Sequence, residues 1–147
     1  MINFTTSQNG IELIAAHEGC RLTAYQDSGK VWTIGYGHTM NVYEGQTITI
    51  EQAKSFLAQD LKLNESYLNL INIAKNQNMF DALMDLIYNC GIGNFQKSEL
   101  FKQIKINPCA MILKQYWWDT CVHDAKGEVL PGLLARRKDE YALYIKS

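Results

Sequence analysis

The sequence predicts an α+β fold that is mainly helical and has one small sheet. Five of the ten glycines fall between positions 19 and 45, whereas positions 46–90 contain none. Within the glycine-rich segment, apolar and polar residues alternate over a short run, as they do in a half-buried strand. Elsewhere, apolar residues recur at three- and four-residue intervals, which is typical of amphipathic helices. We therefore expect a β-rich lobe at about residues 18–48 and a helical lobe at about residues 70–147, which also includes the N-terminal helix.

The first helix is expected to begin after Ser7, because a serine hydroxyl suits the N-cap position. Ile11 and Ile14 lie on its apolar stripe, and Glu18 falls on the same stripe. Gly19 should end the helix, since glycine readily adopts the backbone conformation found after a helix C-terminus. This spacing predicts a Glu18 side chain that is partly buried at the end of the helix.

A β-hairpin is expected next. The polar run Gln26–Gly29 has the composition of a turn, and it precedes a segment in which Val31 and Thr33 alternate with the bulkier Trp32. The hairpin would place Asp27 in the solvated turn. Thr33 would project from the second strand.

A long helix is expected to join the two lobes. Thr49 and Gln52 resemble a capping box, and the helical spacing of apolar residues continues from there to about Leu70. A further helix should run from its N-cap Asn76 to Gly91 and form the core of the helical lobe. Because two lobes can move about a connecting helix, we expect the cleft between them to open and close.

The last third of the chain predicts short helices. We expect a loop at Gly91–Asn94, a helix capped by Ser98 and a helix that begins at Pro108 and reaches Trp117-Trp118. Core packing is favoured for this tryptophan pair, since tryptophan is highly buried on average. A loop at residues 123–131 should precede the final helix.

Composition narrows the class of protein. The chain has 147 residues, of which 47% are hydrophobic and 20% are charged, as expected of one globular domain spanning residues 1–147. A net charge of −1 without a basic cluster argues against nucleic-acid binding. No secretion signal and no apolar run long enough to span a membrane is visible. The four cysteines lack metal-site spacing and are expected to be reduced thiols. We expect a soluble monomer without a metal site or a stable membrane anchor.

Glu18 and Asp27 suit different chemical roles. Partial burial and the negative end of the helix dipole disfavour a charged Glu18, so this residue suits a general acid. Asp27 should stay ionised in its polar turn and suits a base or an electrostatic stabiliser. Glycosidases cut an acetal with one protonated and one ionised carboxyl, and an inverting glycosidase also needs a water between them. Thr33 is a candidate to hold that water. From spacing alone, a glutamate at a helix end before an Asp-Ser-Gly turn is also an ordinary structural feature.

The spacing of Glu18, Asp27 and Thr33, followed at once by Ile34-Gly-Tyr-Gly-His38, resembles the catalytic signature of the phage-type lysozymes, glycoside hydrolase family twenty-four. The resemblance covers nearly the whole chain and extends through Asn89-Cys-Gly91, Phe95 to Ser98 and Pro131-Gly-Leu-Leu-Ala-Arg136-Arg137. It implies a lysozyme-like fold with a cleft between the two lobes.

The same resemblance implies substrate contacts from Tyr88, Asn89, Ser98 and, more weakly, Thr39. Hydroxyl and amide groups are what N-acetyl groups and sugar hydroxyls require. His38 is expected to be a structural residue that pairs with a carboxylate or the backbone.

One of the adjacent arginines Arg136 and Arg137 is implied to lie beside Glu18. A guanidinium group there would lower the pKa of Glu18, whereas burial would raise it, and the sequence leaves open which effect is larger. The residues themselves equally allow a surface ion pair with Asp139 or Glu140.

The resemblance implies an endolysin. Such a muramidase hydrolyses the β-1,4 bond between N-acetylmuramic acid and N-acetylglucosamine in peptidoglycan, without a cofactor, to lyse the host at phage release. It would accumulate in the host cytoplasm and reach the periplasm of a Gram-negative host through a holin. One rival is a lytic transglycosylase, which needs no water-activating carboxylate, and Asp27 and Thr33 argue against it. Another is an inactive peptidoglycan-binding or tail-associated module, against which the presence of all three residues argues.

Overall fold

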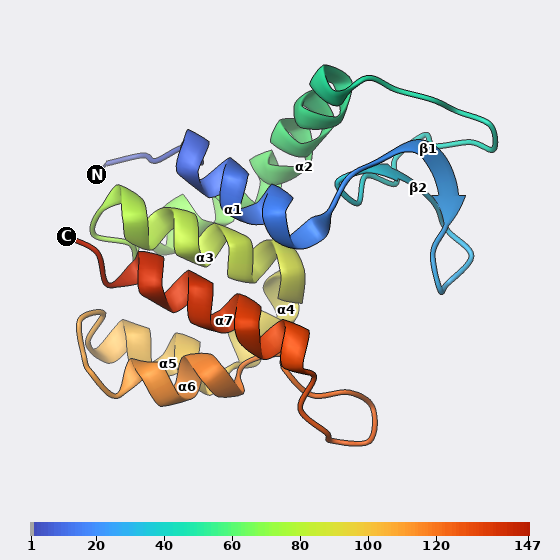
Figure 1. The fold of residues 1–147 in the computed structure, drawn as a ribbon. Coiled ribbons are helices and arrows are strands. Elements are labelled where there is room, and N and C mark those ends of the chain that lie inside the picture. Colours follow the sequence, from blue (N-terminus) through green and yellow to red (C-terminus); the bar gives the residue numbers. More distant parts are fainter. Residues whose placement is uncertain (1) are drawn as a thin grey trace.

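The computed structural model describes residues 2–147. Within this range the chain forms seven helices and one two-stranded sheet, which confirms the predicted fold class, mainly helical with one small sheet. In Figure 1, α3 lies between α1 and α7, and the two strands stand apart from these helices, joined to them by α2. The elements are α1 (Gln8–Glu18), β1 (Arg21–Gln26), β2 (Trp32–Gly35), α2 (Ile50–Ile71), α3 (Gln77–Cys90), α4 (Ile92–Lys97), α5 (Glu99–Ile106), α6 (Leu113–Asp119) and α7 (Pro131–Tyr144).

The first helix and the hairpin form as local signals predict. Ser7 caps α1, because its hydroxyl accepts a hydrogen bond from the backbone N–H of Gly10. β1 and β2 pair antiparallel, with Tyr25 opposite Thr33, and the register shifts on the N-terminal side of Tyr25. A bridge between Thr23 and Thr47 then returns the chain to the sheet before α2 begins.

The long helix α2 starts with the predicted capping box. The N–H of Gln52 donates to Oγ1 of Thr49 over 3.1 Å, and the N–H of Thr49 donates to Oε1 of Gln52 over 2.9 Å. These bonds satisfy two backbone donors that the first turn of a helix leaves free. The helix ends where Asn72 adopts a left-handed conformation, with a φ of 52°.

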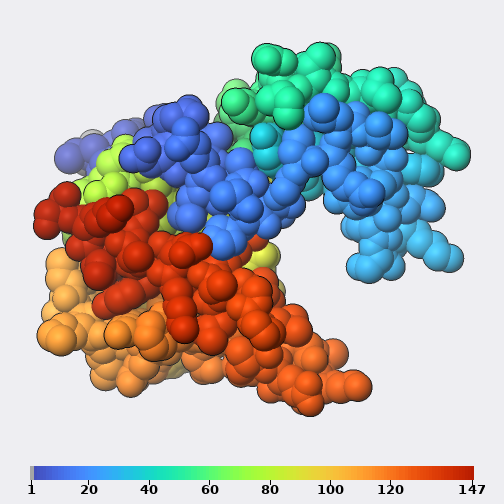
Figure 2. All heavy atoms as spheres, in the orientation of Figure 1, coloured from blue at the N-terminus to red at the C-terminus, as the bar shows by residue number. Residues whose placement is uncertain are grey.

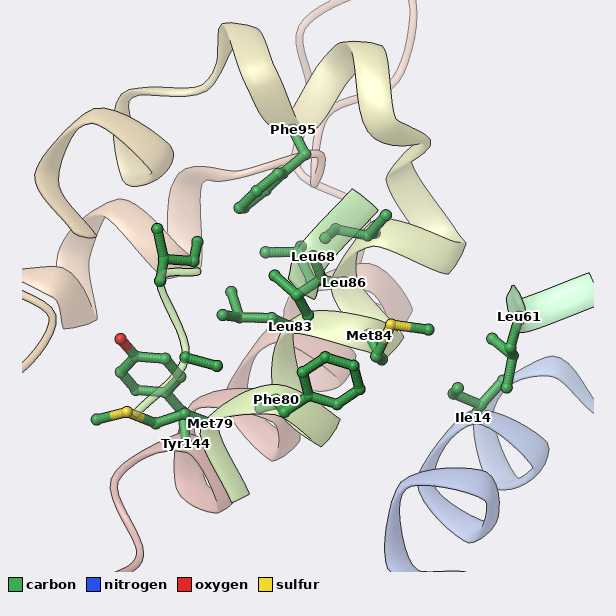
Figure 3. Packing of buried hydrophobic residues seen from close by; sticks show 14 of the residues in the cluster. Ile14, Leu61, Leu68, Met79, Phe80, Leu83, Met84, Leu86, Phe95 and Tyr144 are labelled. Carbon is green, nitrogen blue, oxygen red and sulfur yellow. The ribbon is translucent and has the colours of Figure 1, made fainter. Parts of the chain in front are cut away.

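The core is built around α3. This helix packs against α1, α2, α4 and α7, and its side chains Phe80, Leu83, Leu86 and Ile87 have no exposed surface. Figure 3 shows several of these side chains packed together with residues of neighbouring helices. Burying a leucine or phenylalanine side chain fully contributes about 1.5–3 kcal/mol. The central helix therefore fixes the positions of α1 and α7 relative to each other.

Two predicted boundaries in the last third of the chain are wrong. The predicted loop at Gly91–Asn94 instead enters α4, because the carbonyl of Gly91 accepts from the N–H of Phe95, whose side chain is fully buried. The helix predicted to begin at Pro108 begins at Leu113. The Asn107 side chain accepts from the N–H of Cys109 over 3.0 Å, and such a local bond competes with helix formation. The final helix α7 has a proline in its first turn.

All four cysteines are free thiols, namely Cys20, Cys90, Cys109 and Cys121. Among residues 2–147, no helix combines the length and the apolar character needed to cross a bilayer. The same part of the chain contains no group of His, Cys, Asp and Glu side chains arranged to hold a metal ion.

Candidate active site

The molecule is hollowed between the strands and the loop that precedes α7. Figure 2 shows this hollow between the blue atoms of the hairpin and the orange atoms before α7. A cavity of about 400 Å³ is lined by residues from the end of α1, the segment after β2, α2 and the end of α3: Glu18, Gly37, Thr39, Met40, Asp60, Tyr88 and Asn89. It thus contains four residues that the sequence singled out. A second cavity of similar size, between the start of α3 and the end of α7, contains none of them.

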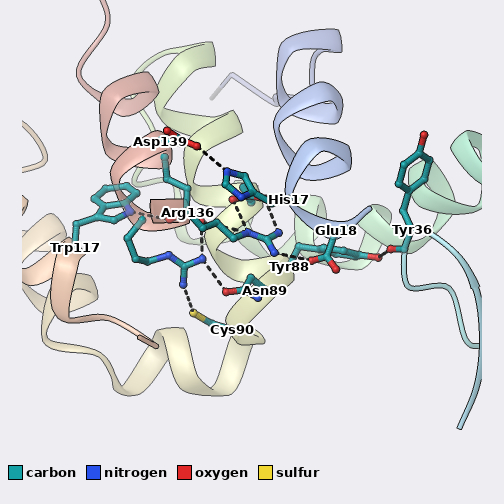
Figure 4. Close-up of polar contacts among 12 residues, drawn as sticks. His17, Glu18, Tyr36, Tyr88, Asn89, Cys90, Trp117, Arg136 and Asp139 are labelled. Atoms are coloured by element: carbon teal, nitrogen blue, oxygen red, sulfur yellow. Dashed lines mark hydrogen bonds and ion pairs between the residues drawn. The ribbon is translucent and has the colours of Figure 1, made fainter. Parts of the chain in front are cut away.

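Glu18 is the last residue of α1, and its side chain retains 23% of its exposure. Its Oε1 lies 2.9 Å from Nη1 of Arg136, whose own side chain is buried (Figure 4). Burial lowers the pKa of Arg136, but its bonds and charge interactions with Asp85 and Glu18 outweigh burial and raise it. Arg136 is therefore a permanent cation beside Glu18. For Arg136, the alternative prediction of a surface ion pair with Asp139 or Glu140 is wrong.

Arg137, the neighbour of Arg136 in α7, is fully buried. Its Nη2 donates to Oε1 of Glu140 over 2.7 Å and to Oδ1 of Asn89 over 2.8 Å. The pair with Glu140 that the sequence allowed is thus made, but inside the protein and not at its surface. Trp117 is fully buried, as predicted, and its Nε1 donates to Oε2 of Glu140 over 2.9 Å.

Tyr88 and Asn89 come together at the cavity because α3 ends there. The Tyr88 hydroxyl donates to the carbonyl of Tyr36 over 2.9 Å. Burial raises the pKa of Tyr88, with further contributions from the charges of Glu18 and Asp60, so the phenol stays protonated. Oδ1 of Asn89 is occupied by the bond from Arg137, which leaves its amide nitrogen as the group that can donate to a ligand.

Ser98 is not brought to this cavity. Its hydroxyl donates to the carbonyl of Phe95 over 2.6 Å and accepts from the N–H of Phe101 over 3.1 Å, which makes Ser98 the N-cap of α5. The helix that the sequence assigned to this cap is present. A substrate contact from Ser98 remains a prediction, and it would require the hydroxyl to share these bonds.

Asp27 and Thr33 lie on the hairpin. Oδ1 of Asp27 accepts from the N–H groups of Gly29, over 2.8 Å, and Val31, over 2.9 Å. Among residues 2–147 the structure shows no hydrogen bond to Oδ2 of Asp27. Thr33 is a buried residue, and its hydroxyl donates to the carbonyl of Val31 over 3.0 Å. Both side chains thus keep oxygen lone pairs that can accept from water.

His38 pairs with a carboxylate, as predicted, and the partner is Asp60 of α2. Its Nδ1 lies 2.8 Å from Oδ2 of Asp60, and its ring stacks on Phe56 with 4.3 Å between ring centroids. Asp60 also lines the cavity, although no pattern in the sequence indicated this residue. The predicted pairing of His38 with a carboxylate could have led to Asp60, but the sequence does not show which acid of the long helix faces the histidine.

A two-stranded lobe joined by one long helix to a helical lobe, with a glutamate at the cavity between them, defines a lysozyme-like enzyme. Residues 15–140 match the family model described as phage lysozyme. An endolysin of Acyrthosiphon pisum secondary endosymbiont phage 1 is 38% identical over 140 residues, which cover 94% of this chain and 96% of that protein.

Solved structures agree with the sequence relatives. The muramidase domain of SpmX from Asticaccaulis excentricus superposes with a TM-score of 0.88 at 32% identity, covering 97% of this chain and 99% of that one. A mutant of P22 lysozyme superposes with a TM-score of 0.85, also at 32% identity and with the same coverage of the two chains. The chain belongs to the phage lysozyme family, whose members are glycoside hydrolases that degrade peptidoglycan.

Proposed function

We propose that this protein is an endolysin with muramidase activity, which hydrolyses the β-1,4 bond between N-acetylmuramic acid and N-acetylglucosamine in peptidoglycan. The observation that carries the proposal is the position of Glu18, which is partly buried at the wall of a cavity lined by hydroxyl and amide groups. A general acid must lie within reach of the glycosidic oxygen that it protonates, and Glu18 lines the cavity in which a glycan strand would bind. Thr39, Tyr88 and Asn89 are the proposed sugar contacts in the cavity, with Ser98 as a further candidate.

Glu18 is the general acid in this mechanism. It protonates the leaving oxygen as the glycosidic bond breaks and positive charge develops on the sugar ring. The bond from Arg136 to Oε1 fixes the carboxyl group and leaves Oε2 toward Gly37, where an added Cβ would lie 3.7 Å from it. The proton for transfer is therefore assigned to Oε2.

Asp27 and Thr33 position the attacking water. Because Thr33 donates its own hydrogen to Val31, its oxygen can accept one hydrogen of the water, while the free Oδ2 of Asp27 accepts the other. In an inverting mechanism this water attacks the anomeric carbon from the side opposite the leaving group. This arrangement predicts inversion at that carbon and requires no cofactor.

Replacement of Glu18 by glutamine tests the function. The amide preserves the shape and the bond to Arg136 but supplies no acidic proton. We expect Glu18→Gln to lower the clearing rate of chloroform-treated Gram-negative cells by roughly a hundredfold or more, with unchanged circular dichroism. A folded variant that kept more than about a tenth of the activity would remove Glu18 as the acid.

The biological role is proposed to be host lysis after a holin opens the inner membrane, with the enzyme held until then in the host cytoplasm. We propose a single catalytic domain over residues 1–147, with a small lobe near residues 18–48 and a helical lobe near residues 70–147. Expression without a holin should leave cells intact until chloroform is added. Prompt lysis without permeabilisation would overturn the holin-dependent route.

A further inference from the structure

Asp85 is a fully buried aspartate on the central helix α3, outside the cavity and outside the proposed chemistry. Burying an ionised carboxylate is costly unless it is paired and hydrogen-bonded. Burial alone would raise the pKa of Asp85, but bonds from Arg136 and Glu140 and the charges of both arginines outweigh it and lower the pKa. Asp85 is thus a buried anion.

The geometry around Arg136 shows what this anion does. Nε and Nη2 of Arg136 donate to the two carboxylate oxygens of Asp85 over 3.0 and 2.7 Å. This bidentate contact occupies one edge of the planar guanidinium group and fixes its orientation. The remaining nitrogen, Nη1, lies 2.9 Å from Oε1 of Glu18. Figure 4 shows Arg136 reaching from α7 to Glu18 at the end of α1.

Glu140 does not supply the same constraint. Its Oε1 lies 3.9 Å from Nε of Arg136, beyond hydrogen-bond distance, and bonds to Arg137 over 2.7 Å instead. Among residues 2–147, Asp85 is therefore the side chain that holds Arg136 by two hydrogen bonds.

We propose that Asp85 is a positioning residue for Glu18 and acts through Arg136. Asp85 lies on the core helix α3 and binds Nε and Nη2 of the guanidinium group. Nη1 of Arg136 is thereby held at Oε1 of Glu18, and Oε2 of Glu18 stays directed into the cavity. This inference rests on the proposed role of Glu18 as the acid. Misplacement of a reacting group by about 1 Å can cost on the order of a hundredfold in rate.

Asp85→Asn tests the proposal, because the amide retains the size of the side chain but cannot accept two hydrogen bonds from one guanidinium edge. The matched control is Asp81→Asn, one turn earlier on α3. Asp81 is also fully buried, and it binds Ser7 and Gln77 instead of an arginine. Asp85→Glu is a second variant that keeps the buried charge but displaces the guanidinium group. If Asp85→Asn does not fold, the kcat of Asp85→Glu tests the positioning role.

Rates are measured on soluble, uncross-linked glycan strands prepared from peptidoglycan, beside thermal unfolding of each variant. We expect both Asp85 variants to lose at least about tenfold in kcat, with KM within about twofold of the parent. Asp81→Asn should lose thermal stability but keep kcat within about twofold. A folded Asp85 variant with parental kcat, or an equal loss of kcat in Asp81→Asn, would overturn the positioning role. An active Glu18→Gln in the same series would instead refute the proposed function.

Discussion

Replacement of Glu140 by glutamine should make the stability of the protein respond differently to pH, because burial raises the pKa of Glu140 in the folded chain. Its two oxygens accept from Arg137, over 2.7 Å, and from Trp117, over 2.9 Å. Burial raises the pKa of Glu140 well above its ordinary value of 4.5, the bond with Asp85 raises it further, and the charge of Arg137 opposes this increase without cancelling it.

The sign of the pH dependence follows from proton binding. Above pH 4.5 the unfolded chain releases the Glu140 proton, whereas the folded chain keeps it up to its raised pKa. Between these values the folded state binds more protons, so Glu140 makes the free energy of unfolding fall as pH rises. One such proton gives a slope of at most about 1.4 kcal/mol per pH unit. From pH 4.5 to pH 7 the total loss is at most about 3 kcal/mol.

Glutamine does not titrate and removes this slope. At pH 5 the variant should be less stable by about 1–3 kcal/mol, because its single carbonyl oxygen cannot serve both buried donors. This deficit should shrink steadily from pH 5 to pH 7. Asp85 does not disturb the comparison, since its pKa is lowered from 3.8 and it is ionised in both states over this range.

Urea unfolding at pH 5, 6 and 7, followed by tryptophan fluorescence, measures the difference between the two proteins. The control is Glu99→Gln, which removes an exposed glutamate paired with Lys102 and should give a difference independent of pH. A difference for Glu140→Gln that is constant or grows with pH would mean that Glu140 is ionised in the folded protein, and the reasoning would fail.

Substitutions at Asp27 on the hairpin and at Gly37 beside the cavity distinguish effects on stability from effects on catalysis. Asp27→Asn keeps the oxygen that accepts from Gly29 and Val31, whereas Asp27→Ala loses both bonds at a cost of about 1 kcal/mol each. Both Asp27 variants should abolish lysis, and an active, folded Asp27→Asn would show that the mechanism does not need the carboxylate. Gly37→Ala should lower the free energy of unfolding by about 1–2 kcal/mol, because the φ of Gly37 is 91°, and should lower activity by placing a methyl group beside Glu18. Gly93→Ala is the matched control, because Gly93 lies in a helix and an added Cβ there would meet open space, and it should slightly stabilise the protein in thermal unfolding. A Gly37→Ala protein as stable and active as the parent would contradict the conformational argument.

Local signals in the sequence predicted the first two-thirds of the fold well. Ser7, Thr49 and Asn76 cap the helices they were expected to cap, because an N-cap bond forms within three residues and depends little on the rest of the chain. The α4 helix was missed because its stability comes from burial of Phe95 in a distant core. Propensity alone does not report such tertiary packing.

Of the residues named from the sequence, Glu18, Thr39, Tyr88 and Asn89 line one cavity, whereas Asp27, Thr33 and Ser98 do not. Glu18, Asp27 and Thr33 were selected because their spacing resembles the catalytic signature of the phage-type lysozymes, and their catalytic roles remain predictions. The partners that surround Glu18 come from helices far away in sequence. Asp85 and Asp60 were not named, because the sequence gives no sign of which residue an aspartate on a helix will face.

The stereochemistry of the reaction product tests the proposed mechanism most directly. Peptidoglycan sacculi are digested, the fragments are analysed by mass spectrometry, and NMR of the earliest product identifies the anomer at the new end of N-acetylmuramic acid. If Asp27 and Thr33 hold a water opposite the leaving group, the product carries a free reducing end and is initially the inverted α anomer. A product that carries an internal 1,6-anhydro ring, lighter by one water, would show transglycosylation and contradict the role of Asp27. A hydrolysed product that is initially β would instead require Asp27 to act as a nucleophile and would contradict inversion.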